Sequence, residues 1–255
     1  MTTLTALALW STLLMTQADD KLKVEPGKQL HESVTVHVGD KEPTDVTVRF
    51  LLFVSKDYKA DGKKWPLMLF LHGRGECGSD LDHVKLHGPP KIVESKPDFP
   101  FIVISPQCPE PGEGLKGVRA AWEPEQLIQL IDHVAGELNV DKDRIYITGL
   151  SMGGFGTWRF TATYPERVAA AVPICGGGDP EKWAKSLAKV PIWAFHGAKD
   201  DVVPPALSEK MVEAIQGEHG DVKLTIYPDA NHNSWEATYN NPKLYDWLLE
   251  HKLKK

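Results

Sequence analysis

The sequence predicts an α/β fold with a mostly parallel sheet of about eight strands, an antiparallel N-terminal hairpin, and helices on both faces. Continuous apolar runs are typical of strands buried on both faces of a parallel sheet, and they recur at 67–71, 101–104, 145–148, 168–174, 192–195 and 224–227. Apolar stripes with helical spacing alternate with these runs, at 127–138, 207–215 and 244–251. Two runs that alternate apolar with polar residues, 34–38 and 46–52, flank a short polar loop and predict the hairpin.

The length and charge of the chain limit its organisation and its partners. Its 255 residues are enough for one sizeable domain with a buried core, and no repeat or linker divides the sequence. We therefore predict a single domain over 19–255. The net charge of −6 argues against a general nucleic-acid binder.

Residues 1–18 differ from the rest of the chain because they contain no Lys, Arg, Asp or Glu. An apolar stretch over 4–15 is followed by Thr16-Gln17-Ala18 and then by charged residues, which is the pattern of a secretory signal peptide cleaved after Ala18. The stretch is short for a transmembrane helix, so we expect a secreted or periplasmic protein with no stable membrane anchor. A signal anchor or a misassigned start is the alternative, because no basic residue precedes the apolar stretch.

The chain has three cysteines, Cys77, Cys108 and Cys175. Exported proteins favour disulfides, and Cys77 and Cys108 each follow an apolar run by a few residues. If those two strands are neighbours, both loops leave the same end of the sheet, and we therefore predict a Cys77–Cys108 disulfide. Cys175 directly follows another apolar run and is expected to be a buried thiol.

An apolar, β-branched run ends in Gly149-Leu150-Ser151-Met152-Gly153 and then becomes a helical pattern. This is the G-x-S-x-G pattern of a nucleophile elbow, in which a serine sits on a strained turn between a strand and a helix. The two glycines allow both backbones to approach closely, which exposes the serine hydroxyl. The five residues alone are a weak signal, and an ordinary glycine-rich turn is the alternative; the preceding strand and following helix strengthen the interpretation.

A serine nucleophile needs a histidine base, and the histidine needs a carboxylate that fixes its tautomer. In the elbow architecture the acid and then the histidine follow the serine along the chain. Asp200 and Asp201 both lie in the loop after the run 192–195, and composition alone does not separate them. His232 follows the last apolar run and is the expected base. His196 is close to the acid loop and is interpreted as a packing residue at the end of a strand.

Hydrolysis also needs hydrogen-bond donors for the developing oxyanion. One donor is expected from the backbone N–H of Met152, the residue after the nucleophile, and another from a loop after an early strand. The glycine-rich stretch 72–78 follows the run 67–71, and we predict the amide of Arg74 as the second donor. A plain glycine-rich connection is the alternative, and the side chains of Arg74 and Glu76 could pair to rigidify the loop.

Taken together, these motifs resemble the α/β-hydrolase superfamily, and more closely the small secreted carboxylesterases of the phospholipase/carboxylesterase, feruloyl-esterase and polyhydroxybutyrate-depolymerase-like kind. The matching stretches are His-Gly-Arg-Gly-Glu at 72–76, Ser-Pro-Gln-Cys-Pro at 105–109, Gly-Leu-Ser-Met-Gly-Gly at 149–154, His-Gly-Ala-Lys-Asp at 196–200 and Asn-His-Asn-Ser-Trp at 231–235. The resemblance implies that Asp200, rather than Asp201, is the catalytic acid. It also implies that no metal and no organic cofactor takes part.

The expected function is therefore a serine hydrolase that cleaves carboxylic esters through an acyl-enzyme, using Ser151, His232 and Asp200. Trp122 and Trp235 are candidate pocket residues, and the irregular segment 106–124 is expected to be an active-site loop.

No large insertion interrupts the sheet pattern, and the open site expected from this favours a bulky or polymeric ester, such as an acylated polysaccharide, although a small ester also fits. The alternatives are a serine peptidase of the prolyl-oligopeptidase-like type and a non-catalytic binding protein on a hydrolase scaffold.

Overall fold

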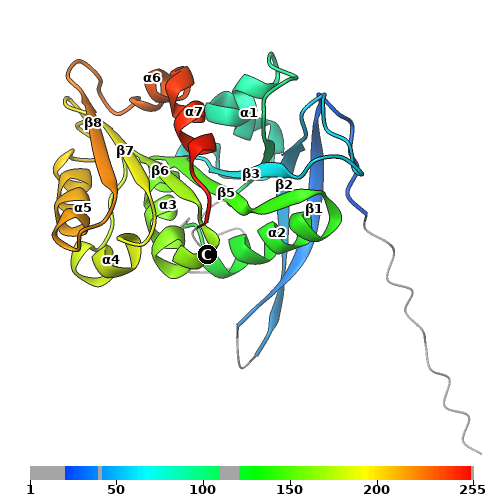
Figure 1. The fold of residues 1–255 in the computed structure, drawn as a ribbon, viewed down its shortest axis with the longest axis horizontal. Coiled ribbons are helices and arrows are strands. Elements are labelled where there is room, and N and C mark those ends of the chain that lie inside the picture. Colours follow the sequence, from blue (N-terminus) through cyan, green and yellow to red (C-terminus); the bar gives the residue numbers. More distant parts are fainter. Residues whose placement is uncertain (1–20, 40–41, 110–120, 254–255) are drawn as a thin grey trace, which may run out of the picture.

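The computed structural model describes residues 21–39, 42–109 and 121–253 (Figure 1). An eight-stranded sheet forms its centre, in the order β1-β2-β4-β3-β5-β6-β7-β8. The strands are β1 (Gln29–Val38), β2 (Thr44–Phe53), β3 (Trp65–Leu71), β4 (Ile102–Pro106), β5 (Val140–Leu150), β6 (Ala170–Ile174), β7 (Ile192–Gly197) and β8 (Val222–Tyr227). The β1–β2 and β2–β4 pairs are antiparallel and all other neighbours are parallel. The predicted sheet and its N-terminal hairpin are confirmed.

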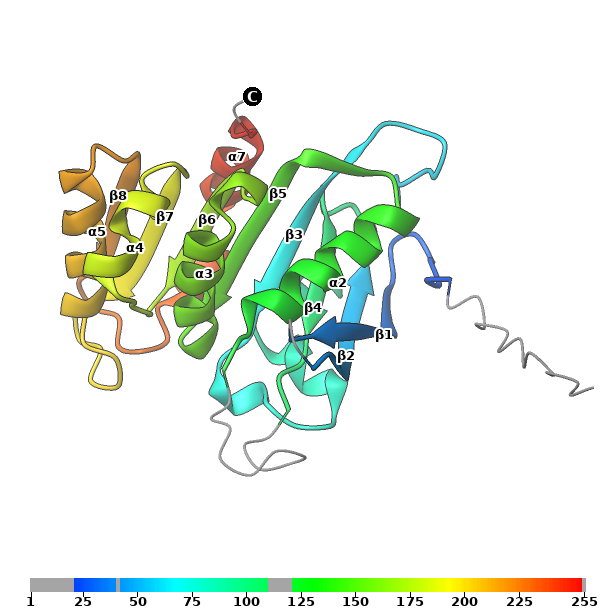
Figure 2. The ribbon, with the colours of Figure 1, turned by 90° about the horizontal axis from the view of Figure 1, so that it is seen from below.

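Helices cover both faces of the sheet, as predicted (Figure 2). One face carries α2 (Pro124–Glu137), α3 (Met152–Thr163), α4 (Pro180–Leu187) and α5 (Ala206–Gly217). The other carries α1 (Gly88–Val93), α6 (Trp235–Tyr239) and α7 (Pro242–Glu250). The described residues also form three short 3-10 helices: η1 (Arg74–Glu76), η2 (Leu81–Leu86) and η3 (Pro165–Arg167).

The same strands supply two apolar cores because successive strand residues point to opposite faces. Leu69 and Ile147 belong to the core shared with α2, α3 and α5. Met68 and Tyr146, one position earlier in β3 and β5, belong to the core shared with α1 and α7. Every residue of β3 is buried, whereas β1 at the sheet edge alternates between exposed and partly buried positions along most of its length. This explains why the central strands are continuous apolar runs and the hairpin is an alternating pattern.

The strand order reverses beside the elbow. β3 lies between β4 and β5, so the direction in which the chain adds strands reverses at this point. In open α/β sheets, ligands bind outside the carboxyl ends of the strands at such a reversal. Leu71 and Gly149 are register partners near the ends of β3 and β5, which brings the loop 72–78 against the elbow.

The structure contradicts the predicted Cys77–Cys108 disulfide. β3 and β4 are parallel neighbours, as that prediction assumed, and both cysteines are buried near the ends of these strands. The loops bring the two side chains within hydrogen-bonding reach but not to bonding distance, and both remain thiols. The hydrogen bond with Cys77 lowers the pKa of Cys108, against the opposing effect of burial. Cys175 is a buried thiol, as predicted.

Two predictions fall on residues that the structure does not describe. The predicted signal peptide over 1–18 lies outside the described residues, and so do residues 110–120 of the predicted active-site loop. Among the helices of the described ranges, none has the length and apolar character needed to cross a membrane.

Candidate active site

Ser151 sits on a sharp turn between β5 and α3. Its backbone has φ 52° and ψ −116°, a conformation that a residue with a side chain adopts only under strain. Close backbone packing explains the flanking glycines. A Cβ on Gly153 would lie 1.9 Å from the carbonyl oxygen of Leu71, and a Cβ on Gly149 would lie 2.5 Å from the carbonyl oxygen of Gly153. The strained turn holds the serine at the carboxyl end of β5, as a nucleophile elbow requires.

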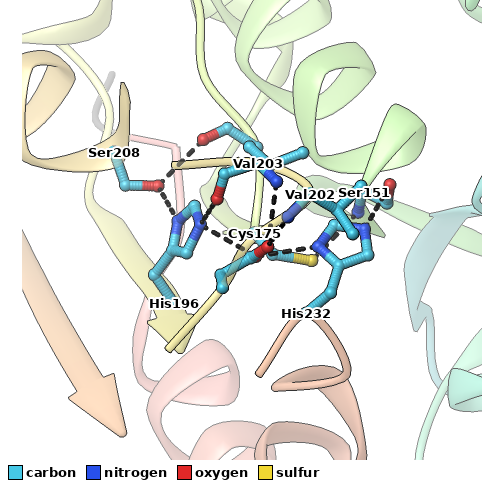
Figure 3. A network of polar contacts seen from close by, with 9 residues as sticks. Ser151, Cys175, His196, Val202, Val203, Ser208 and His232 are labelled. Carbon is cyan, nitrogen blue, oxygen red and sulfur yellow. Dashed lines mark hydrogen bonds and ion pairs between the residues drawn. The ribbon is translucent and has the colours of Figure 1, made fainter. Parts of the chain in front are cut away.

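The structure brings together the three predicted triad residues. Oγ of Ser151 lies 2.9 Å from Nε2 of His232, and Nδ1 of His232 lies 2.8 Å from Oδ2 of Asp200 (Figure 3). An ionised carboxylate only accepts hydrogen bonds, so Nδ1 carries the ring proton and Nε2 accepts from the serine hydroxyl. Asp201, the other candidate acid, is exposed.

Asp200 is buried but charged. Its Oδ1 accepts the backbone N–H groups of Val202 at 3.0 Å and Val203 at 2.9 Å. Burial is the largest single effect on the pKa of Asp200 and raises it, but the hydrogen bonds from His232 and the two amides together outweigh burial, and the pKa lies below its ordinary value. The carboxylate is therefore an anion at neutral pH and can stabilise a positive charge on His232.

The two tryptophans predicted near the pocket support the site in different ways. The indole of Trp235 meets the ring of His232 edge-on, with centroids 5.4 Å apart. Trp122 is buried against the ring of His72 and donates its Nε1–H to the carbonyl oxygen of His72 at 3.2 Å. Trp235 thus limits the movement of His232, while Trp122 packs behind the loop that follows β3.

Two buried side chains brace that loop. His72 donates its Nδ1–H to the carbonyl oxygen of Gly73 at 2.5 Å, and its Nε2 accepts the backbone N–H of Cys108 at 3.0 Å. Burial lowers the pKa of His72 to about 4, so the ring is neutral at pH 7, as these two contacts require. Oε2 of Glu76 accepts the N–H of Gly73 at 2.8 Å. Glu76 is therefore turned into the loop, whereas Arg74 is exposed.

The predicted oxyanion donors are the first residues of two helices, Met152 in α3 and Arg74 in η1. N–H groups in the first turn of a helix have no carbonyl partner within that helix. The two segments also touch, because a Cβ on Gly73 would lie 2.7 Å from Cδ1 of Leu150. The assignment of these two amides to an oxyanion hole stays a prediction.

Cys175 contacts the turn that carries Ser151. It has φ 40°, and its sulfur accepts the backbone N–H of Ser151 at 3.3 Å. Burial raises the pKa of Cys175 to about 12, so it is a thiol at neutral pH. Its sulfur, an oxygen of Asp200 and a ring nitrogen of His232 lie within 4.8 Å of one another, and they are the donors in the described residues that could hold a metal ion.

His196 has a part in the site that sequence reasoning missed. The side chain is fully buried, and its Nε2 lies 2.9 Å from the carbonyl oxygen of Val203 and 3.2 Å from Oδ2 of Asp200. The signal that could have found it is the His-Gly-x-x-Asp spacing, in which a histidine at a strand end precedes an acidic residue in the following loop by four positions.

The structure is similar to the crystal structure of a thermostable esterase, with a TM-score of 0.68 and 34% sequence identity. The likeness covers 86% of this chain and 63% of that one. The chain is an α/β hydrolase. Residues 120–243 of this α/β hydrolase match the Dienelactone hydrolase family, and they include Ser151, Asp200 and His232 but not the loop 72–78.

Two curated proteins are also similar to parts of this α/β hydrolase. The bifunctional acetylxylan esterase/xylanase XynS20E of Neocallimastix patriciarum is 28% identical over 185 residues, which cover 71% of this chain and 26% of that protein. The poly(3-hydroxyalkanoate) depolymerase C of Paucimonas lemoignei is 31% identical over 175 residues, which cover 51% of this chain and 41% of that protein. The matched region therefore spans less than half the length of either relative.

Proposed function

We propose that this α/β hydrolase cleaves carboxylic esters through an acyl-enzyme. A continuous hydrogen-bond chain from Ser151 through His232 to Asp200, at 2.9 Å and 2.8 Å, carries the proposal. Similarity to a thermostable esterase and to an acetylxylan esterase/xylanase supports the same reaction class.

In the proposed mechanism, Nε2 of His232 takes the hydroxyl proton as Oγ of Ser151 attacks the ester carbonyl carbon. The amides of Arg74 and Met152 stabilise the negative oxygen of the tetrahedral intermediate. The bond to the alcohol oxygen then breaks, and His232 returns its proton to that oxygen, which leaves an acyl-enzyme. A water molecule repeats the sequence at the acyl carbon, giving the carboxylic acid and restoring the Ser151 hydroxyl. Asp200 stays ionised and stabilises the imidazolium in both halves.

For the substrate we propose a bulky or polymeric ester with an apolar acyl or alcohol part. Phe155 and Val202 are large apolar side chains that are 37% and 65% exposed. Their backbones adjoin the triad, because the N–H of Phe155 donates to the carbonyl oxygen of Ser151 and the N–H of Val202 donates to Asp200. Exposed apolar side chains on these two segments support an apolar substituent on the ester. Relatives named as an acetylxylan esterase and a poly(3-hydroxyalkanoate) depolymerase support a polymeric ester.

Labelling with a fluorophosphonate probe, together with steady-state hydrolysis of p-nitrophenyl esters, tests the reaction class. The wild-type protein is expected to be labelled and active. Ser151→Ala is expected to lose labelling and on the order of 10⁴-fold or more in kcat, because the nucleophile is removed. Ser186→Ala removes a partly buried hydroxyl that donates to Ala162 outside the site and is the matched control, with labelling retained. An unlabelled wild-type protein, or a Ser151→Ala variant of near wild-type rate, contradicts the proposal.

A substrate panel separates the proposed esterase from a serine peptidase. Acetyl, feruloyl and p-nitrophenyl esters are compared with peptide anilides by kcat/KM, since the same triad can cleave either bond. Esters are expected to be preferred. Faster cleavage of the anilides would favour a peptidase of the prolyl-oligopeptidase-like type.

We also propose that the protein is secreted or periplasmic. The uncharged apolar residues before Asp19 support export. N-terminal sequencing of the protein recovered from the medium or the periplasmic fraction is expected to begin at Asp19. Recovery of a chain that begins at Met1 in the cytoplasmic fraction contradicts export.

A further inference from the structure

The geometry points to His196 as a positioning residue that holds the Asp200 carboxylate in the orientation that His232 needs. Its kinetic test rests on the proposed ester hydrolysis, whereas the contacts themselves do not depend on any substrate. In Figure 3, His196 and His232 lie on either side of the polar network, with Ser208 next to His196 and Ser151 next to His232.

Nε2 of His196 faces two acceptors. The carbonyl oxygen of Val203 lies 2.9 Å from it, and Oδ2 of Asp200 lies 3.2 Å from it. Neither a carbonyl nor an ionised carboxylate can donate, so Nε2 must carry a proton and direct it toward this pair. Nδ1 of His232 donates to the same Oδ2 at 2.8 Å. One carboxylate oxygen therefore faces two imidazole rings.

These contacts surround the carboxylate. Oδ1 of Asp200 accepts two backbone N–H groups, from Val202 and Val203, and Oδ2 faces the two rings. An ionised carboxylate offers about four acceptor positions. Hydrogen bonds from Val202, Val203 and His232 take three of them, and Nε2 of His196, which bonds the carbonyl oxygen of Val203, lies 3.2 Å from Oδ2. The side chains of Asp200 and His196 are both fully shielded from solvent, so water does not compete for these positions. Rotation of the carboxylate would weaken contacts at both oxygens, which fixes the direction from which His232 is held.

The far side of His196 is anchored as well. Its Nδ1 lies 2.7 Å from Oγ of Ser208 in α5, and that hydroxyl lies 2.9 Å from the carbonyl oxygen of Gly176. If the Ser208 hydroxyl donates to Nδ1, the His196 ring is neutral. If the hydroxyl donates to Gly176, Nδ1 donates to Ser208 and the ring is a cation. In both states Nε2–H faces Asp200, so the orienting contact does not depend on which state is present.

This arrangement predicts a kinetic effect that loss of packing alone would not produce. The donor from His196 draws part of the Asp200 charge away from His232. Without that donor the carboxylate interacts more strongly with His232 and favours its imidazolium. Activation of Ser151 needs an unprotonated Nε2 on His232. The acidic limb of the pH profile of kcat/KM therefore moves to higher pH in the variant. A less firmly held carboxylate also lowers kcat, because the base is less well placed.

The test compares His196→Leu, which has no donor, with His196→Gln, which keeps a side-chain N–H. The matched control is Thr148→Val, because Thr148 is buried in β5 and its hydroxyl bonds Val172 and Tyr239 away from Asp200. His196→Leu is expected to lower kcat by up to about 10²-fold with little change in KM, and to shift the acidic limb upward. His196→Gln is expected to recover part of both effects. Thr148→Val is expected to lower Tm without moving the limb.

Some outcomes overturn the role of His196. A His196→Leu protein with a lowered Tm but with wild-type kcat and pH profile shows that His196 only packs. A His196→Gln protein whose kcat and pH profile are as impaired as those of His196→Leu shows that a side-chain N–H at this position does not orient Asp200. If His196→Leu does not fold, Ser208→Ala removes the anchor of Nδ1 instead, and an unchanged kcat and limb in that variant also overturns the proposal.

A substrate-free measurement separates this inference from the proposed function. The proton between His232 and Asp200 is expected to give a low-field ¹H resonance in the wild-type protein, which moves in His196→Leu and not in Thr148→Val. A wild-type protein that hydrolyses no ester contradicts the proposed function only. A resonance that is identical in wild type and His196→Leu contradicts the role of His196, whether or not the protein is an esterase.

Discussion

Two parallel strands of the sheet lead into the same dipeptide. β3 is followed by His72-Gly73, and β7 ends in His196-Gly197. Both histidines are completely buried beside the site. His72 meets one backbone donor and one backbone acceptor, which a neutral ring satisfies. His196 instead directs one nitrogen at a carbonyl oxygen and a carboxylate.

The difference shows that the partners of a buried histidine determine its role. On the β3 side, burial lowers the pKa of His72 to about 4, and the neutral ring ties the loop 72–78 to the backbone at Cys108. On the β7 side, the hydrogen bonds that Asp200 accepts keep the pKa of its carboxyl below the ordinary value despite burial. Asp200 is therefore an anion, and His196 faces this charge. One side of the site is held by neutral contacts to the backbone and the other by contacts to an anion.

The largest expected effect comes from removing that anion. Asp200→Asn is expected to lower kcat by about 10⁴-fold, because an amide neither stabilises the His232 imidazolium nor enforces its tautomer. Asp201→Asn is the matched control, because Asp201 is adjacent but exposed, and its kcat is expected to stay near that of the wild type. Steady-state kinetics on a p-nitrophenyl ester measures both. A larger loss at Asp201 contradicts the assignment.

The next largest effect comes from the neutral His72 ring on the β3 side of the site, and it changes the free energy of unfolding. The pKa of His72 is about 4 in the folded protein against an ordinary value of 6.5. Between these pH values the unfolded chain binds a proton that the folded ring does not, so the free energy of unfolding falls as pH drops from 6.5 to 4. Over this pH range, His72 is expected to lower the free energy of unfolding by about 3 kcal/mol.

Urea unfolding at several pH values measures this loss, and His72→Asn is the comparison because asparagine does not titrate. The variant is expected to show a flatter dependence of unfolding free energy on pH across the same window. A slope equal to that of the wild type would show that His72 is not held neutral by the fold.

The smallest effect tests how the loop 72–78 is braced. Glu76→Ala leaves the N–H of Gly73 without its acceptor and is expected to lower the free energy of unfolding by roughly 1–3 kcal/mol. Glu76→Gln keeps an acceptor oxygen and is expected to cost about 1 kcal/mol or less. Denaturant unfolding at pH 7.5 compares the two. Equal losses would mean that the charge of Glu76, rather than its hydrogen bond to Gly73, stabilises the loop.

Most of the fold could be predicted because its signals are local. Continuous apolar runs identified the buried strands, and the alternation at 34–38 and 46–52 identified the hairpin, since each pattern follows from which faces of a strand are covered. The helices α1, α4 and α6 were not predicted, because they are short.

The sequence by itself determined the elbow and the order of the site. Gly149 and Gly153 bracket Ser151 because any Cβ there meets backbone, and that requirement is visible in five residues. Composition alone could not separate the neighbours Asp200 and Asp201; the family resemblance implied Asp200, and the tertiary structure shows that Asp200 contacts His232 while Asp201 is exposed. The tertiary structure also decided that His196 faces Asp200 and that Cys77 and Cys108 remain thiols. The cysteine outcome depends on distances of a few ångströms between two loops far apart in the chain, which no local pattern encodes. The His196 contact lies within the local His-Gly-x-x-Asp spacing, but that spacing does not show which way the ring points.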